Sequence, residues 1–384
     1  MSPKAKLLTG AFLALLIIPC CAENAVGDVT ISPTLALSES YDSNVFFRGE
    51  TGEVEDDFLT TISPQLAMAS EGRRSSLSAT YRLNSILYHD ESSLNYISHQ
   101  ARLAISVDLT ERTTIGIKDA FDYTQDSLEA LDTDVQTGRT DIMSNTAGIA
   151  MEQALGHSTS LGLNYSNSVV DFDGPGFTDT MRDSAGAELG YSLTEERKLK
   201  TNYSYSNFSF DSDGGTTHSE SHALRFILSE RIRPTIAYNV SAGVVFISDS
   251  SDDYDWTASA GLEKSFKNST LGIGYSRDIT HSSGLGEEVS IQDRGHMDLD
   301  YSLARSLVFT LSGAVSKNRS KFSEQLELIS YSASAGLSWQ PYEWMETGIA
   351  YHRFQQWDDN SLENDVTRDR VSLIITLKPT TWRL

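Results

Sequence analysis

Several polar side chains recur in this 384-residue chain at spacings that could support chemistry. His218 and His222 are four residues apart, and His296 and Asp298 are two apart, as in a carboxylate that orients an imidazole. In an extended strand, four residues span about 13 Å, which is too far for two histidines to share one metal ion. The motifs of serine hydrolases, zinc proteases and phosphate-binding loops are missing from the sequence. We therefore expect no metal site, no cofactor and no enzymatic activity.

Aspartates are concentrated between Asp249 and Asp255, where clustered carboxylates could hold a divalent cation. The segment lacks the glycine and the terminal glutamate of an EF-hand loop, so a solvated acidic loop is the favoured interpretation. Weak calcium bridging to lipopolysaccharide phosphates stays open as a second hypothesis.

The largest chemically capable set consists of charged side chains that occur singly within alternating sequences. Arg82 lies in Leu77–Asn84, where odd positions are apolar or aromatic and even positions are polar. Alternate residues of a strand share one face. Charges of both signs on that face would be costly in a dry core but are expected where water fills a barrel. The pore-lining candidates are Arg82, Arg102, Lys118, Arg182, Glu188, Arg225, Glu263, Arg294, His296, Asp298, Asp300, Glu346, His352 and Arg370.

Long antiparallel strands must position these residues, because two-residue alternation extends through nearly the whole chain. Each expected strand has about a dozen residues, enough for the roughly 9–11 that a tilted strand needs to cross a bilayer. The predicted fold is all-β, an antiparallel transmembrane β-barrel of about 18 strands (16–18), wide enough for an aqueous channel. The strands are expected at 29–44, 58–70, 75–88, 95–107, 113–124, 141–154, 159–171, 180–193, 198–210, 218–230, 235–248, 255–265, 270–281, 290–303, 307–319, 328–339, 344–357 and 368–378.

The connections alternate between two kinds, which must lie at opposite ends of one barrel. Short turns at 71–74, 110–112, 194–198, 230–234 and 264–268 carry many basic residues, whereas longer loops at 50–57, 125–140, 211–217, 249–255, 282–288 and 358–369 are acidic. In outer-membrane barrels the short turns face the periplasm and the longer loops are extracellular. The loop 125–140 is the longest and is the candidate for a constriction folded into the mouth, although it could equally lie outside, solvated.

The N-terminus has the pattern of a secretory signal. Lys4 and Lys6 precede an apolar run from Leu7 to Ile18, and small residues lead to an expected cleavage after Ala22. Lipid attachment at Cys20 is the alternative, but Pro19 stands where a lipoprotein signal usually has a small residue. We expect 1–22 to be a signal peptide and 23–384 a single outer-membrane β-barrel without cysteine, which excludes disulfides, thiolate catalysis and covalent haem.

Charge limits the partners of the chain. It has 30 Lys+Arg against 53 Asp+Glu and a formal charge of −23, which argues against nucleic acid because phosphate contacts need clustered basic residues. The expected partners are outer-membrane lipid and lipopolysaccharide, together with the barrel-assembly machinery.

The segment Ser38–Phe46, with the sequence SESYDSNVF, and the serial amphipathic hairpins resemble the outer-membrane β-barrel porin family associated with exopolysaccharide loci in Gram-negative bacteria. The resemblance implies an outer-membrane location and a part in polysaccharide export or general diffusion, with polysaccharide as a partner. The chain departs from such barrels at its end, Trp382-Arg383-Leu384, because they commonly end in Phe.

The leading functional hypothesis is a water-filled pore for passive or selective passage of solutes. The alternatives are a conduit or accessory protein for exopolysaccharide export, a barrel enzyme, and a sheath for an electron-transfer cytochrome. Opposed charges on neighbouring strands could also brace the wall and plug the lumen instead of lining a pore.

Overall fold

The computed structural model describes residues 27–49, 52, 54–130, 134–174, 176–212, 214–248, 252–280, 289–321, 327–358 and 365–383. The expected signal peptide, 1–22, lies outside these residues, as does Leu384 at the C-terminus.

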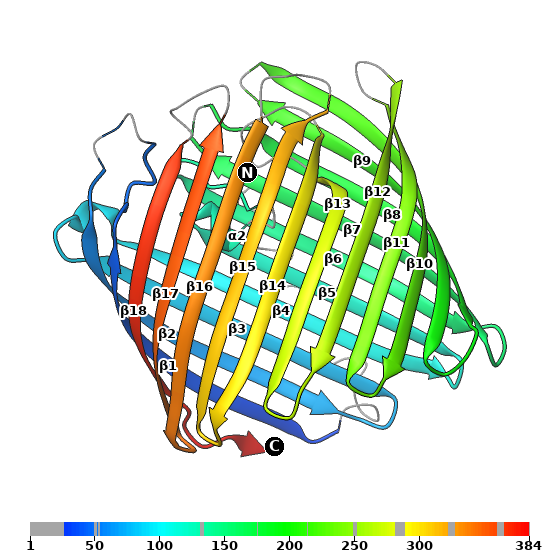
Figure 1. Cartoon of the computed structure of the whole chain (residues 1–384), viewed down its shortest axis with the longest axis horizontal. Coiled ribbons are helices and arrows are strands. Elements are labelled where there is room, and N and C mark those ends of the chain that lie inside the picture. The colour runs from blue at the N-terminus through cyan, green and yellow to red at the C-terminus, as the bar shows by residue number, and fades with distance from the viewer. Residues whose placement is uncertain are drawn as a thin grey trace.

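Long strands account for most of the described chain (Figure 1). They are β1 (Val29–Asp42), β2 (Asp57–Glu71), β3 (Ser75–Tyr88), β4 (Tyr96–Thr110), β5 (Thr113–Thr124), β6 (Asp141–Ala154), β7 (Thr159–Asp173), β8 (Asp179–Ser192), β9 (Arg197–Ser212), β10 (Gly215–Arg233), β11 (Ile236–Ser248), β12 (Asp252–Ser265), β13 (Ser269–Thr280), β14 (Ser290–Ala304), β15 (Leu307–Ser320), β16 (Glu327–Tyr342), β17 (Met345–Asp358), β18 (Val366–Leu377) and β19 (Trp382–Arg383). The helical elements among the described residues are two short segments, η2 (Ser92–Leu94) and α2 (Ser127–Ala130).

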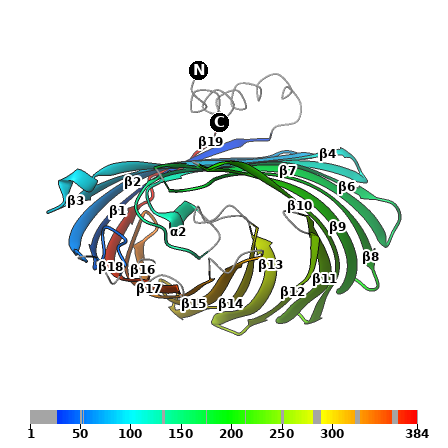
Figure 2. The ribbon, with the colours of Figure 1, turned by 90° about the horizontal axis from the view of Figure 1, so that it is seen from above.

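Strands β1 to β18 form one closed antiparallel barrel. Each strand pairs with its neighbours in the chain, and β1 also pairs with β18 over eight residue pairs from Leu35↔Leu377 to Asp42↔Arg370. The short β19 adds a two-residue pairing with the start of β1. Viewed along the barrel, the strands enclose a ring that is wider in one direction than in the other (Figure 2). The predicted barrel of about 18 strands is confirmed.

The two-residue alternation determines which side chains face outward. On β18, Val371, Leu373 and Ile375 are exposed apolar side chains on the outer face, whereas Arg370 reaches Asp42 on the inner side. The same alternation on all the long strands gives an exterior of exposed Leu, Ile, Val, Tyr and Trp. A continuous apolar exterior of this kind is suited to lipid and not to water.

The inner face is lined mainly by small and polar residues, with apolar clusters confined to the long-loop end. Val45, Leu59, Ile86 and Tyr88 form one such buried cluster beneath the first two loops. Toward the short-turn end, an added Cβ at the inward Gly272 would meet no atom within 4 Å, and the inward side chains of Lys118, Glu263 and Asp298 are exposed. The lumen is therefore filled near one mouth and hollow below it.

Two of the expected acidic loops are shorter than the sequence pattern predicts. The expected loop 211–217 is a tight turn, because β9 runs to Ser212 and β10 starts at Gly215, whose φ of +124° is accessible to glycine. The expected loop 249–255 shrinks as well, since β12 begins at Asp252. In both places the strands continue above the apolar exterior as polar hairpins, which an alternation of apolar residues does not reveal. Within the described residues, no helix is long and apolar enough to cross a membrane.

Candidate functional site: a loop across the lumen

The connection between β5 and β6 folds into the barrel instead of lying outside it. Figure 2 shows its helical turn, α2, inside the ring of strands. The backbone N–H of Gln136 donates to Oε1 of Gln356 on β17 at 2.9 Å, and Nε2 of Gln356 donates back to the carbonyl of Gln136 at 3.1 Å. Both side chains are buried. This reciprocal pair fixes the loop to the wall on the far side of the lumen.

Further contacts attach the same loop to β14 and β16. Asp134 forms an ion pair with Arg294 on β14, and Ser330 on β16 donates its hydroxyl to the carbonyl of Asp134 at 2.6 Å. Val135 is buried against Leu328 on β16. In an 18-stranded ring, β5 and β14 are nine strands apart in either direction. The described parts of the loop therefore span the lumen from one wall to the opposite one.

A buried ion cluster holds the start of the loop. The guanidinium of Arg368, on β18, binds Asp126 of the loop at 2.6 Å and Asp42 of β1 at 2.8 Å, and all three side chains are at most 4% exposed. Arg370 contacts the same Asp42 oxygen at 2.8 Å. Phe47, which has a positive φ of 56°, places its ring 4.3 Å from the Arg368 guanidinium carbon. Mutual pairing satisfies charges that would be too costly to bury alone.

Glu129 of α2 lies beside this cluster. Burial raises the pKa of its carboxyl to about 7, and the neighbouring charge of Asp126 adds to the effect, whereas Arg368 and a hydrogen bond from Thr124 oppose it. The loop thus contains one acid whose protonation changes near neutral pH.

The end of the loop is tied to the other long loops by Arg139. Its guanidinium donates to the carbonyls of Val45 and Leu94, each at 2.9 Å, and to the hydroxyl of Tyr88 at 3.0 Å. It also lies 5.1 Å from the centre of the Tyr96 ring. Three long-loop segments consequently form one packed body at this mouth.

All fourteen sequence-predicted pore residues occupy the inward register of their strands, opposite the exposed apolar positions. Six of them form ion pairs: Arg102 with Asp122, Glu188 with Lys200, Arg225 with Asp278, Arg294 with Asp134, Glu346 with Lys378, and Arg370 with Asp42. Most of these partners are on adjacent strands, which fits the bracing role. Arg225 and Arg294 are different, because Arg225 of β10 reaches β13 and Arg294 binds the loop.

The other candidates are not brought together. Arg82 donates to the Gln65 amide oxygen at 2.8 Å and Arg182 to the hydroxyls of Ser184 and Ser206. Among the described residues, Lys118, Glu263, Asp298 and Asp300 have no ion-pair partner, and His352 lies close to the charge of Arg368. Whether these side chains line a conducting path stays a prediction.

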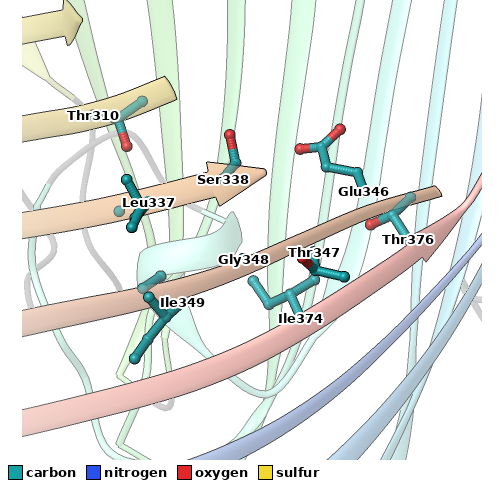
Figure 3. Close-up of a pocket in the computed structure, with 11 residues that line it drawn as sticks. Thr310, Leu337, Ser338, Glu346, Thr347, Gly348, Ile349, Ile374 and Thr376 are labelled. Atoms are coloured by element: carbon teal, nitrogen blue, oxygen red, sulfur yellow. The ribbon is translucent and has the colours of Figure 1, made fainter. Parts of the chain in front are cut away.

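Two small hollows lie along the wall, where the strands stay paired. One, of about 210 Å³, lies where Gly336 and Gly348 carry no side chain, bordered by Thr310, Glu346 and Thr376 (Figure 3). A second, of about 360 Å³, is bordered by Arg294, His296 and Asp298 of β14 and by Ser312 and Ser332. Within the described chain, no group of three His, Cys, Asp or Glu side chains is placed to hold a metal ion.

The outer face of the long-loop end carries a belt of hydrogen-bonded tyrosines. Tyr165 donates to Asp183 at 2.6 Å, Tyr275 to Asp293 at 2.7 Å and Tyr351 to Asp369 at 2.6 Å, each across one hairpin. Tyr203 bonds His222 at 2.8 Å, so this histidine belongs to the belt. Amphipathic rings with a polar tip are typical of a membrane interface.

Sequence reasoning missed the residues that anchor the loop, namely Arg368, Asp42, Asp126, Gln136 and Gln356. Arg368 has the same parity as Arg370, and that signal could have placed it on the inner face. Arg368 lies where the expected loop 358–369 and the expected strand 368–378 overlap, whereas β18 begins two residues earlier, at Val366.

Comparison with known proteins agrees with this architecture. Residues 23–158 match the family described as "Putative beta-barrel porin 2". No curated protein sequence matches the chain. The fold is similar to that of OccK2 (OpdF) from Pseudomonas aeruginosa, with a TM-score of 0.51 and 11% identity over 93% of this chain and 99% of that chain. It is also similar to OccK9 (OpdG) of the same organism, with a TM-score of 0.50 and 10% identity over 94% and 100% of the two chains.

A further OccK2 structure, in complex with glucuronate, matches with a TM-score of 0.51 and 11% identity over 93% of this chain and 100% of that chain. The match over 23–158 confirms the resemblance to β-barrel porins, without the association with exopolysaccharide. The apolar exterior, the tyrosine belt and this match describe a porin-like β-barrel of the outer membrane.

Proposed function

We propose that this porin-like barrel passes small polar solutes through a lumen that the loop 125–140 narrows. The observation that carries the proposal is that this loop leaves the wall between β5 and β6 and is attached on the other side of the ring, to Arg294 of β14, Ser330 of β16 and Gln356 of β17. Below the loop, glycine and serine leave the interior hollow, and charges of both signs face inward. Such an interior suits the passage of solutes, which supports a channel over a barrel enzyme.

The position of the loop favours small solutes over a polymer. A segment fixed to both walls divides the mouth, and a polysaccharide chain would have to pass beside it. For this reason a solute pore is preferred to the export conduit, and nothing in the geometry supports the cytochrome sheath. Outer-membrane lipid, lipopolysaccharide and the assembly machinery remain proposed partners.

Single-channel conductance in planar bilayers tests the proposal. The purified barrel should give small, discrete steps, and replacing 125–140 by a short Gly-Ser linker should increase the step size because the obstruction is removed. A matched control shortens the β9–β10 turn at 212–215, which is remote from the loop contacts, and should leave the step size unchanged.

Liposome swelling extends the test to solute size. Swelling with glycine and glucuronate but not with an oligosaccharide, and loss of this cut-off in the linker variant, would support the assignment. A native barrel and a linker variant that both remain electrically silent would overturn it.

A further inference from the structure

The wall of the barrel is incomplete at one seam. Strands β12 and β13 pair from Ser265↔Thr270 only as far as Ala258↔Arg277, although β12 begins at Asp252 and β13 ends at Thr280. On either side the ladders continue, with Ser248↔Asp252 between β11 and β12 and Thr280↔Ser290 between β13 and β14. The long-loop ends of β12 and β13 are therefore separate.

Aspartate side chains replace the missing ladder bonds. The backbone N–H groups of Tyr254 and Trp256 donate to Oδ1 of the preceding residues, Asp253 and Asp255, each at 2.7 Å. On the other strand, the N–H of Ile279 donates to Oδ1 of Asp278 at 2.8 Å. Unpaired strand edges normally expose such groups. Here the sequence Asp-Tyr-Asp-Trp and the dipeptide Asp-Ile satisfy them locally.

Two of these aspartates, Asp253 and Asp255, also bind cations from other strands. Arg277 contacts Asp255 at 3.1 Å and Asp293 at 2.7 Å, and its guanidinium carbon lies 4.3 Å from the centre of the Trp256 ring. Its side chain is only 7% exposed. Lys321 adds contacts to Asp253 at 2.8 Å and Asp255 at 3.0 Å. We call the contacts of Arg277 and Lys321 with these aspartates the seam latch.

On the lumen side, Arg225 of β10 makes a second bridge. It forms an ion pair with Asp278 of β13 and donates from Nε to the Thr257 hydroxyl of β12 at 3.2 Å. One guanidinium thus holds both strands without any backbone bond between them.

Ile279 shows where the end of β13 that is separate from β12 lies. By alternation it shares the side of Ile273 and Tyr275, which face outward. Instead it packs against buried residues on the inner faces of β9 and β11, including Phe208, Phe210, Val245 and Ile247. Figure 2 shows the end of β13 turned toward the middle of the ring. The end of β13, which stays paired with β14 as far as Thr280↔Ser290, therefore lies on the inner side of the wall at this mouth.

We propose that this strand end is a two-position gate held inward by the seam latch. In the second position the ladder continues in its existing register, with Thr257 opposite Asp278, Trp256 opposite Ile279 and Asp255 opposite Thr280. Ile279 would then lie beside Trp256 on the outer face, as its parity in the sequence dictates, and Asp278 would still face Arg225. The backbone N–H groups of Trp256 and Ile279 are satisfied in both positions, by aspartates in one and by the ladder in the other, as a bistable element requires.

A disulfide between Trp256→Cys and Ile279→Cys tests the movement without relying on conductance. These positions are directly opposed only in the second position, in which the ladder between β12 and β13 continues. Leu262→Cys with Ile273→Cys supplies the control, since that pair is already opposed. The control should cross-link fully in all backgrounds. The test pair should cross-link partly, and severalfold more when Asp255→Asn weakens the latch. A test pair that never cross-links while the control does would overturn the proposal.

A conductance measurement then tests the gate separately from the pore. The role of the gate in solute passage rests on the proposed pore function. In a channel that keeps Trp256 and Ile279, Asp255→Asn should raise the fraction of time that the channel spends at a larger conductance step. Asp183→Asn removes the same charge from the outer belt on β8 and should not. Cross-linking without any conductance would overturn the proposed function but leave the movement standing, whereas cross-linking with unchanged steps would overturn the gate.

Discussion

Arg368 is the residue on which the position of the loop depends most. Its side chain is 4% exposed, and its guanidinium forms ion pairs with two carboxylates from different parts of the chain, Asp42 and Asp126. Removing one partner of a buried ion pair leaves the other charge uncompensated, which costs about 3–5 kcal/mol in proteins. Arg353 on the neighbouring strand pairs with Asp369 at 46% exposure, where such a pair contributes about 0–1 kcal/mol.

We therefore expect Arg368→Met to lower the free energy of unfolding by several kcal/mol and to release the loop. Urea unfolding of the barrel in lipid vesicles measures the first effect, and a larger conductance step reports the second. Arg353→Met is the matched control and should change neither by more than a fraction of these amounts. Equal effects of the two substitutions would contradict the role given to Arg368.

Glu129 gives the docked loop a dependence on pH. Its pKa is about 7 when docked against an ordinary value of 4.5, so the docked state binds the proton more tightly than the released state does. By linkage, docking is strongest below about pH 4.5 and weakens as the pH rises toward about 7, with no further change from this group above that. Below the lower value the acid is neutral in both states.

Protease protection of the loop should accordingly fall between about pH 4.5 and about pH 7. Glu129→Gln keeps the shape of the neutral acid, so this variant should hold the protection at its low-pH level throughout the range. A wild-type profile that rises with pH, or one that Glu129→Gln leaves unchanged, would rule this acid out as the cause.

At the scale of the strand, inward glycines differ according to what lies beside them. A Cβ at Gly243 on β11 would lie 2.4 Å from the carbonyl oxygen of Leu224, a backbone atom of the adjacent strand. A Cβ at Gly272 on β13 would meet nothing within 4 Å. The first glycine is required by strand contact, and the second only leaves room in the lumen.

Gly243→Ala should therefore destabilise the barrel by about 1–3 kcal/mol, the usual cost of forcing atoms into a packed site. Gly272→Ala should be close to neutral in stability. The stability of the two variants is compared by their heat-dependent mobility on gels and by the midpoints of their unfolding in urea. A loss of stability in Gly272→Ala as large as in Gly243→Ala would show that the strand contact is not the cause.

The strands themselves follow from local sequence, and most of their ends agree with the alternation to within about three residues. Leu77–Asn84, for example, lies within β3 (Ser75–Tyr88), as expected. Alternation fails where polar residues extend a hairpin beyond the apolar exterior, as at Asp211 and Gly215. Alternation also fails at Ile279, whose parity predicts an outward side chain although it packs on the inner side. The reason is that the pairing of β13 with β12 ends at Arg277, and the pairing of strands is a tertiary property.

At the scale of the whole molecule, closure turns a two-faced sheet into an interior and an exterior. The sequence alone determined the all-β class, the strand number and the face on which Arg82 or Arg370 would lie, because strand alternation is local and repeats in every hairpin. The number of strands then makes a ring wide enough for water. These properties need no knowledge of which strands meet.

Only the tertiary structure decided what fills the ring. Asp126, Arg368 and Asp42 are far apart in the chain, and they meet because β1 pairs with β18 and the loop 125–140 crosses the lumen. The gap between β12 and β13 likewise depends on packing against β9 and β11. Local sequence sets which face a residue occupies, whereas contacts between distant segments arise only when the ring closes, and these contacts determine how open its mouth is.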